Sequence, residues 1–461
     1  MRLLTSRWFL PTALLGMLAI YALTQLELRV DPRPKGSRAD IAALAQRGDL
    51  NVLFVLIDTL RADRLGAYGY ARPTSPGMDY LAASGVRFAR HRAQSSWTKT
   101  SMASLWTGLY PVRTGVLRYS DALAPQARVP AEVFREAGFV SVGIWRNGWV
   151  GPNFGFQQGF EIYQSPAPGQ SPQTLRRRAR AGRIAGTDID LVYSGMEFLR
   201  SHRDQRWFLY VHFMDVHQYV TDAASALFGS SYSDGYDNAI RWVDRQLQGL
   251  VGELERLGLR ERTLVVVASD HGEAFGEHWH EGHARDLYRE VTHTPLILSF
   301  PFRLEPGIVV ETPTENVDLW PTLLELVGLP PLPDADGRSR LPELLGGAED
   351  GSGAQDVDFA QLDRTWGRVG AAPASLVAVR EGSYRLIHDA RDPDADELYD
   401  LAGDPSEFED IAREAPEVAQ RLSARAHRYL EQGVAWGQDA PQVELDDMHL
   451  RQLRALGYAI E

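Results

Sequence analysis

Short apolar runs alternate along the chain with longer stretches in which apolar residues recur at helical spacing. Five runs have the length of strands and are apolar at nearly every position, which is typical of strands buried on both faces of a parallel sheet. They occupy residues 51–57, 140–145, 207–213, 263–269 and 295–300. Helix-like stretches lie at residues 98–107, 131–137, 187–200, 236–257 and 315–327. This alternation predicts an α/β fold with a doubly wound, mostly parallel sheet.

The pattern changes after residue 330. Residues 330–356 are rich in Pro, Gly, Asp and Glu and predict a loop. Three short runs follow, SLVAVR, SYRLIHD and ELYDL, with turn signals between them, and then a helix-like stretch over residues 414–432. We therefore predict a main domain over residues 50–355 and a smaller subdomain over residues 356–461, built from an antiparallel sheet and one helix.

The N-terminal residues 8–26 form a run of 19 residues without a charge, preceded by Arg2 and Arg7. A helix of that length spans about 28 Å, enough to cross a bilayer core. Because flanking arginines stay in the cytoplasm, the run predicts a signal anchor over residues 1–28 and an extracytoplasmic location for the rest. Residues 29–49 would then be a polar tether. Two alternatives remain open, a cleaved signal peptide, which would make the protein secreted, and a buried N-terminal helix.

Composition and charge exclude several classes of protein. The 461 residues carry 48 Lys and Arg against 61 Asp and Glu, a formal net charge of −13. This balance argues against nucleic acid as a partner, because nucleic-acid binders generally present a basic face. The chain has no cysteine, which excludes disulfides, cysteine nucleophiles and thiolate zinc sites.

Polar side chains follow three of the predicted strands where each one ends. Asp58 follows the first strand, Asp215 and His217 follow residues 207–213, and Asp270 and His271 follow residues 263–269. In an open α/β sheet the carboxyl ends of the strands form the usual binding site, so these side chains should lie close together. Carboxylates with imidazole suit Zn²⁺, Mn²⁺, Mg²⁺ or Ca²⁺.

Four blocks of sequence resemble a known family. They are VLIDTLRADRLGAYGYARPTSPGMDYLAASGVRF, ASLWTGLYPVRTGV, SDHGEAFGEH and ELYDLAGDPSE, in this order between residues 51 and 412. Together they are similar to the sulfatase family of the alkaline-phosphatase superfamily. The resemblance implies a metal-dependent hydrolase or transferase whose substrate is an anionic sulfate or phosphate ester. It also implies that Asp58, Asp270 and His271 are metal ligands.

The sequence departs from that family at the nucleophile. Sulfatases carry Cys or Ser there, followed by x-Pro-x-Arg, and oxidise it to formylglycine. This chain has Thr98 at that place and lacks the Pro and Arg. Thr98 looks like the unmodified Thr of phosphoethanolamine transferases, lipoteichoic acid synthases and nucleotide pyrophosphatases. A bound cation and a helix N-terminus can both activate such a hydroxyl, so Thr98 is expected to be nucleophile and metal ligand. Thr100, Ser101 and a purely helix-capping Thr98 are the alternatives.

Further side chains are expected around this centre. His217 and His283 are predicted catalytic residues that bind substrate oxygens or protonate the leaving group. Asp215 and His212 could complete a second metal site or bind substrate, although His212 could equally be a core histidine. Lys99 and Arg61 are plausible anion clamps. Because Thr59 replaces the second Asp usual in Ca²⁺-binding sulfatases, Zn²⁺ or Mn²⁺ is favoured over Ca²⁺, with one ion expected and a second possible.

These observations predict a metal-dependent hydrolase of phosphate or sulfate esters that uses a threonine nucleophile, with phosphate favoured. Three other functions stay open. One is a membrane-anchored transferase of phosphoethanolamine or another phospho-headgroup, and another is a sulfuric ester hydrolase that works without formylglycine. The last is a catalytically silent binding protein, against which the complete set of metal ligands argues.

Overall fold

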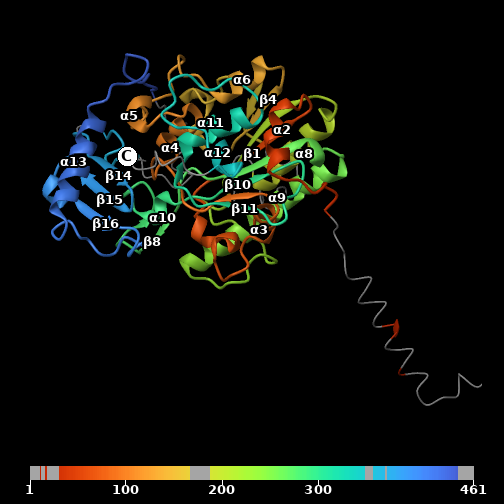
Figure 1. Ribbon diagram of the computed structural model, residues 1–461, viewed down its shortest axis with the longest axis horizontal. Helices are drawn as coiled ribbons and strands as arrows, with labels where there is room; N and C mark the ends of the chain where they lie inside the picture. The colour runs from red at the N-terminus through yellow and green to blue at the C-terminus, as the bar shows by residue number, and fades with distance from the viewer. Residues whose placement is uncertain are drawn as a thin grey trace, which may run out of the picture. The chain divides into compact units, whose positions relative to one another are not determined.

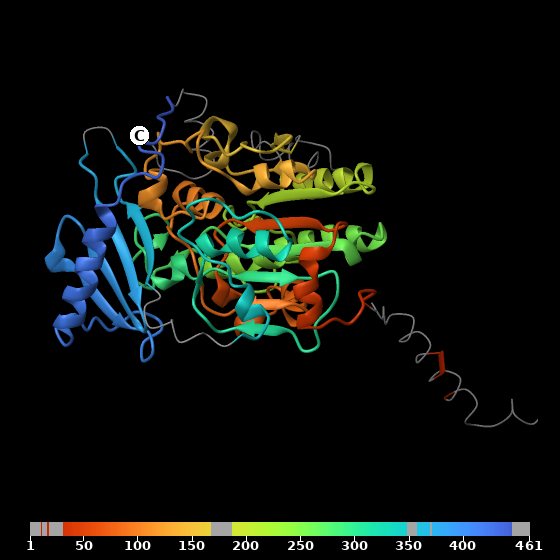
Figure 2. The same cartoon turned by 45° about the horizontal axis from the view of Figure 1, so that its top comes forward.

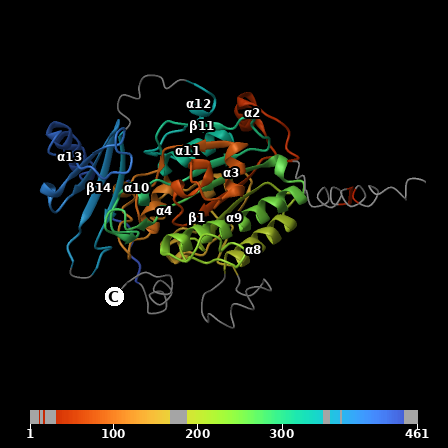
Figure 3. The ribbon, with the colours of Figure 1, turned by 90° about the horizontal axis from the view of Figure 1, so that it is seen from below.

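The computed structural model describes residues 31–166, 187–347, 357–368 and 371–444, together with residues 11, 16 and 17. The chain divides into two compact units, Met1–Arg33 and Pro34–Glu461. The second unit contains all the sheets described below and is shown in three views (Figures 1, 2 and 3).

An eight-stranded sheet forms the centre of the second unit. Its strand order is β11-β2-β10-β7-β1-β6-β4-β5. Strand β10 runs antiparallel to both its neighbours, and the other pairs are parallel. The prediction of a doubly wound, mostly parallel sheet is confirmed. The strands are β1 (Asn51–Ile57), β2 (Val86–Phe88), β4 (Val140–Ile144), β5 (Ile162–Gln164), β6 (Trp207–Phe213), β7 (Thr263–Ala268), β10 (Leu296–Ser299) and β11 (Ile308–Val310).

Helices cover both faces of this sheet. Side chains of β1 alternate between two hydrophobic cores, and all seven of its residues are buried, as its continuous apolar run predicts. One core contains α4 (Thr98–Thr107), α6 (Pro130–Glu136) and α11 (Asn316–Leu326). The other contains α3 (Pro76–Ala83) and the adjacent helices α8 (Asp188–Ser201) and α9 (Tyr232–Arg256), seen together in Figure 3.

The C-terminal part forms a separate antiparallel sheet, drawn in blue in Figure 2. Its strands are β13 (Val357–Asp363), β14 (Ser375–Glu381), β15 (Tyr384–Asp389) and β16 (Glu397–Asp400), in that order. Helix α13 (Pro416–Leu430) packs on the sheet through Leu422, Ala426 and Tyr429. The predicted antiparallel sheet with one helix is confirmed.

Short elements complete the described part of the chain. They include α5 (Pro111–Thr114), α10 (Arg289–Thr292), α12 (Leu341–Leu344), and the strand pairs β3 (His91–Arg92) with β12 (Thr314–Glu315) and β8 (Ala274–Phe275) with β9 (Glu281–Gly282). Residues predicted to be a polar tether include helix α2 (Arg38–Ala43), and Ile41 and Leu44 are buried. Their spacing of three residues is that of one helix face, which the proline-marked start of the segment obscures. The exact domain limits stay predictions.

The predicted transmembrane anchor is wrong for the residues that the structure describes. Among them, none of the helices has both the length and the apolar character that crossing a membrane requires. The run at residues 8–26, on which the anchor was predicted, lies outside the described residues except for positions 11, 16 and 17. The membrane-anchored, extracytoplasmic location that rested on this run is therefore withdrawn.

Candidate active site

Three neighbouring strands bring the predicted metal ligands together. Strand β1 lies between β6 and β7, so the residues after β1 and β7 meet at one edge of the sheet. The amide of Thr59 donates to Asp270 Oδ1 at 3.2 Å, which joins the two strand ends directly. One ligand atom each from Asp58, Asp270 and His271 lies within 4.8 Å of the others, and all three residues are buried. No other group of this kind occurs in the described ranges.

The chemistry of this cluster fits a divalent cation. Asp58 Oδ1 and Asp270 Oδ2 are buried and accept no hydrogen bond. His271 Nδ1 lies 2.9 Å from the carbonyl oxygen of Gly272 and can only donate to it, so in the neutral ring the lone pair is on Nε2. Burial and the nearby charge of Asp58 raise the pKa of Asp270. Two buried carboxylates with unsatisfied oxygens are costly unless a cation neutralises them, so this cluster is chemically suited to hold a divalent cation.

Thr98 lies at the edge of the cluster, where the sequence predicts the nucleophile. It is the first residue of α4 and is fully buried. Its Oγ1 lies 3.1 Å from His271 Nε2, the atom whose lone pair is available. The hydroxyl of Ser101, one of the alternatives, donates to the backbone oxygen of Asp270 at 2.6 Å. Thr98 is therefore the hydroxyl that touches a metal-ligand side chain.

Asn147 connects Thr98 with Asp58, a role that the sequence analysis missed. It lies three residues beyond β4, before the 3₁₀ turn Gly148–Val150. Its Nδ2 donates to Asp58 Oδ2 at 2.6 Å and to Thr98 Oγ1 at 3.3 Å. The amide of Trp149 donates to its Oδ1 at 2.9 Å, which fixes the orientation of the side chain. The sequence could have indicated Asn147, because it follows a buried strand, as Asp58 does.

His212 supports Asp58 from inside strand β6. Its Nε2 lies 3.1 Å from Asp58 Oδ2, and its Nδ1 lies 2.8 Å from the hydroxyl of Tyr210. Burial alone would raise the pKa of Asp58, but the hydrogen bond from His212 and the nearby histidines hold it below its usual value. His212 thus contacts a metal ligand rather than belonging to the ligand cluster.

Two further predicted histidines stack beside His271. The ring centroids of His271 and His283 are 4.7 Å apart, and those of His283 and His217 are 5.0 Å apart. Burial lowers the pKa of His217 to about 4, so this imidazole is neutral at pH 7. Burial also acts on His283, but Glu273 Oε2, 3.1 Å from its Nδ1, raises the pKa of His283. Glu273 is a second residue that the sequence analysis missed, although it lies in the SDHGEAFGEH block.

Asp215 does not join the metal cluster. Its carboxylate accepts from the guanidinium of Arg146 at 2.6 Å and from Trp242 Nε1 at 2.9 Å. Arg146 also pairs with Asp188 at 2.6 Å, and all of these side chains are buried. The expected second cation site with Asp215 is therefore not formed, because arginine already neutralises this carboxylate.

The two expected anion clamps are also engaged elsewhere. Lys99 is fully buried, and its ammonium donates to the backbone oxygens of Tyr119 at 2.5 Å and Asp121 at 2.7 Å. It also lies 4.1 Å from the ring centre of Phe154. The guanidinium of Arg61 pairs with Asp63 at 2.7 Å and Glu277 at 2.6 Å. Neither cation is placed as expected.

The known proteins that this chain is similar to include sulfatases and a phosphonate monoester hydrolase. The model of the Sulfatase family matches residues 50–329, and a model of the N-sulphoglucosamine sulphohydrolase C-terminal region matches residues 276–433. The chain is 27% identical to N-acetylgalactosamine-6-sulfatase of Canis lupus familiaris, over 68% of this chain and 69% of that protein. It is 26% identical to arylsulfatase A of Homo sapiens, and the match covers 83% of this chain and 88% of that protein. Among solved structures, phosphonate monoester hydrolase of Agrobacterium radiobacter is 25% identical, with a TM-score of 0.66 over 83% of this chain and 95% of that one.

Proposed function

Because the chain belongs to the sulfatase family, we propose that it is a metal-dependent hydrolase of phosphate esters whose nucleophile is the unmodified hydroxyl of Thr98. Hydrolysis of a sulfate or phosphate ester is the activity that the family and the similar phosphonate monoester hydrolase support. The preference for phosphate and the identity of the nucleophile are the parts that we propose.

One observation carries the proposal, the place of Thr98 Oγ1 at 3.1 Å from His271 Nε2. A chain without cysteine cannot make formylglycine from cysteine, and Thr98 occupies the position where the sulfatase nucleophile is expected. A formylglycine hydrate can release sulfate by elimination, whereas a threonine ester must be hydrolysed. Phosphothreonine is a reasonable intermediate for such an enzyme, which is why we favour phosphate.

Asp58, Asp270 and His271 would hold the cation, together with Thr98 Oγ1. A divalent cation there would supply Lewis acidity that lowers the pKa of the threonine hydroxyl. We favour Zn²⁺ or Mn²⁺ over Ca²⁺, because the set contains an imidazole and only two carboxylates. The Thr59 hydroxyl donates to the backbone oxygen of Asp58 at 2.7 Å and offers no replacement for a third carboxylate.

The remaining steps follow from side chains of this chain. Thr98 reacts as the alkoxide, its proton having been released to solvent. Its Oγ1 forms a bond to phosphorus while the bond to the leaving oxygen breaks, and Asn147 donates a hydrogen bond to Oγ1. His283, whose pKa Glu273 raises, supplies a proton to the leaving oxygen. In the second step water attacks phosphorus while the bond to Oγ1 breaks, His283 accepts a proton from that water, and Thr98 leaves as the alkoxide, ready for the next cycle.

A sulfuric ester hydrolase is the second candidate, because the relatives named above are sulfatases. The same nucleophile could also pass its phosphoryl group to an acceptor alcohol instead of water. A silent binding protein is disfavoured by the complete ligand cluster, which serves no purpose without a cation.

The test is an initial-rate assay of the full chain with 4-nitrophenyl phosphate, bis(4-nitrophenyl) phosphate and 4-nitrophenyl sulfate. Zn²⁺, Mn²⁺ and Ca²⁺ are supplied in turn, and Thr98→Ala serves as the control for contaminating phosphatases. Faster turnover of a phosphate ester, lost in Thr98→Ala, is the expected result. Preference for the sulfate ester would support the second candidate, and equal rates in wild type and variant would reject Thr98 as nucleophile.

A further inference from the structure

A short hairpin carries two residues of the active site on its flanks. Strands β8 and β9 pair antiparallel, with Ala274 opposite Gly282, and residues 276–280 join them. Glu273 comes directly before β8 and His283 directly after β9. These are the two partners of the 3.1 Å contact that orients His283. Any shift of the hairpin therefore moves both ends of that contact.

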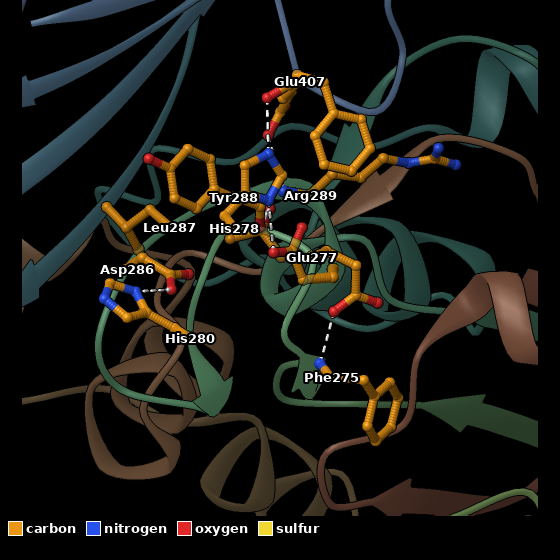
Figure 4. Close-up of polar contacts among 12 residues, drawn as sticks. Phe275, Glu277, His278, His280, Asp286, Leu287, Tyr288, Arg289 and Glu407 are labelled. Atoms are coloured by element: carbon orange, nitrogen blue, oxygen red, sulfur yellow. Dashed lines mark hydrogen bonds and ion pairs between the residues drawn. The ribbon is translucent and has the colours of Figure 1, made fainter. Parts of the chain in front are cut away.

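His278 fastens this hairpin to the rest of the protein (Figure 4). Its Nδ1 lies 2.7 Å from Glu290 Oε1 on α10, and its Nε2 lies 2.6 Å from the backbone oxygen of Glu407. Its ring stacks on Tyr288 at 3.9 Å and on Phe408 at 4.8 Å between centroids. Two of these four partners, Glu407 and Phe408, belong to the loop that follows strand β16 of the C-terminal sheet.

The loop that receives His278 is itself held firmly. Both carboxylate oxygens of Glu407 accept from Arg385 of strand β15, at 2.7 and 2.8 Å, and this pair is buried. The amide of Arg289 donates to Glu407 Oε2 at 2.8 Å. Arg385 also donates to the backbone oxygen of Leu287 at 2.6 Å. A fixed loop of this kind can transmit the position of the C-terminal sheet to His278.

We propose that His278 is a positioning residue through which the C-terminal sheet holds the β8–β9 hairpin, and thereby His283, in the geometry that catalysis requires. The inference rests on the proposed function, because it assigns an effect on the proton transfer by His283. It extends that function by making the C-terminal sheet a part of the catalytic arrangement, although that sheet supplies none of the metal ligands.

The chemistry of His278 suits this role. Both partners of its ring nitrogens are oxygen acceptors, so both contacts are hydrogen bonds only when the ring is protonated. Burial opposes protonation, but Glu290 and the backbone oxygen and charge of Glu407 raise the pKa of His278 to about 9. Two other carboxylates near it have partners of their own. Glu407 forms an ion pair with Arg385, and Glu397 accepts a hydrogen bond from the Tyr288 hydroxyl. The guanidinium of Arg289 contacts the backbone oxygen of Pro405 and His293 Nδ1.

The same hairpin offers a matched control. His280 is also a histidine in the connection, and its Nδ1 pairs with Asp286 Oδ2 at 2.9 Å. Its side chain is 46% exposed, whereas that of His278 is 9% exposed. Asp286 belongs to the segment before α10 and not to the C-terminal sheet. Replacing His280 thus removes a side-chain contact with Asp286 from the hairpin without touching the loop of Glu407.

The experiment compares His278→Gln, Phe408→Ala and His280→Gln in the full chain. Gln can donate to only one of the two oxygens, and Phe408, which is 64% exposed, can be removed without burying a charge. Steady-state rates are measured with phosphate esters of a good and a poor leaving group, 4-nitrophenol and phenol. Hydrogen–deuterium exchange of residues 274–283 is followed in parallel as a measure of hairpin opening that needs no turnover.

We expect faster exchange of the hairpin in His278→Gln and Phe408→Ala. We also expect kcat/KM, which reports the transfer of the phosphoryl group to Thr98, to fall about tenfold or more for phenyl phosphate and by much less for 4-nitrophenyl phosphate. A merely structural role would lower both rates equally. The proposal would be overturned if the hairpin of His278→Gln exchanged as slowly as that of wild type. It would also be overturned if the variant lost activity equally with both esters, or if His280→Gln showed the same effects.

Failure of the proposed function would be visible separately. In that case the wild type itself would show no turnover that depends on Thr98, with either ester. The exchange measurement would still decide whether His278 holds the hairpin, since it does not depend on activity. A wild type that is active through Thr98, with unchanged kinetics in His278→Gln, would reject only the positioning role.

Discussion

Thr98 Oγ1 and His271 Nε2 lie 3.1 Å apart, although 173 residues separate them in the sequence. The contact joins the first turn of helix α4 to the end of strand β7. It places a hydroxyl beside the one imidazole of the metal-ligand cluster, and the experiments below start from this arrangement.

Replacing Thr98 by Ala should abolish turnover, by about 10⁴-fold or more, because no other hydroxyl of the described residues contacts a side chain of the ligand cluster in the same way. The far-ultraviolet circular dichroism spectrum and most of the metal affinity should persist, since three ligands remain. Thr98→Ser is the matched control and should retain part of the activity. Mass spectrometry of acid-quenched reactions should detect a phosphoryl group on Thr98 in the wild type, and labelling elsewhere would contradict the assignment.

Removal of the cation should abolish activity and lower the melting temperature. Metal at about 100 times its dissociation constant stabilises the folded state by about 2.7 kcal/mol.

Asp270→Asn should have opposite effects on the melting temperature without and with metal. Without metal the Asp270 carboxylate is unfavourable, because burial and the charge of Asp58 raise its pKa. Without metal the variant should melt at the same temperature as wild type or higher, and with metal it should melt lower. Calorimetry with and without chelator tests this, and a variant less stable in both states would contradict it.

Asn147→Ala should reduce kcat/KM by about tenfold to hundredfold, because the variant loses the donors to Asp58 Oδ2 and Thr98 Oγ1 together. It should also cost about 1–3 kcal/mol of stability, since the buried Asp58 carboxylate loses one of its two donors and keeps only His212. Asn147→Asp should be worse than Asn147→Ala in the absence of metal, because it adds a third buried carboxylate. Rates and urea unfolding of both variants decide this, and full activity in Asn147→Ala would remove Asn147 from the active site.

The stability of the protein should depend on pH through His278. Its folded-state pKa is about 9, above the unperturbed 6.5, so the folded state holds this proton more tightly than the unfolded chain does. Its contribution is therefore complete below about pH 6.5 and disappears as the pH rises through about 9. Between these values the melting temperature of wild type should fall more than that of His278→Gln. Parallel curves for the two proteins would show that His278 does not titrate in this way.

The sequence predicts that Asp58, Asp270 and His271 lie together because they follow long apolar strands. Asp58 comes immediately after β1, and Asp270 and His271 come within three residues of the end of β7. The carboxyl ends of parallel strands meet at one edge of an open sheet, which brings these residues together. Asn147 obeys the same rule but lies beyond two bulky residues, Trp145 and Arg146, so its approach to Asp58 depends on the path of the turn.

Side-chain direction is what the sequence does not determine. Lys99 follows Thr98 on a helix, where consecutive side chains point about 100° apart, and it therefore enters the apolar region beside Phe154. Asp215 also follows a strand, but Arg146, two residues beyond the neighbouring strand β4, pairs with its carboxylate. Arg61 is captured in the same way by Asp63 and Glu277. The pairs Arg146–Asp215 and Arg61–Glu277 depend on contacts between segments that are distant in the sequence.

The central position of β1 has a consequence for folding. The amide of Thr59 and the carboxylate of Asp270 meet across 211 residues, and Asp58 meets His212 across 154. Contacts of such long range form late, because closing large loops costs chain entropy before the contacts repay it. A nascent chain released before β7 is made would lack two of the three ligands. Capture of a cation would therefore report that β7 has joined the sheet, and it would fasten this late strand to β1, the first strand of the sheet to be synthesised.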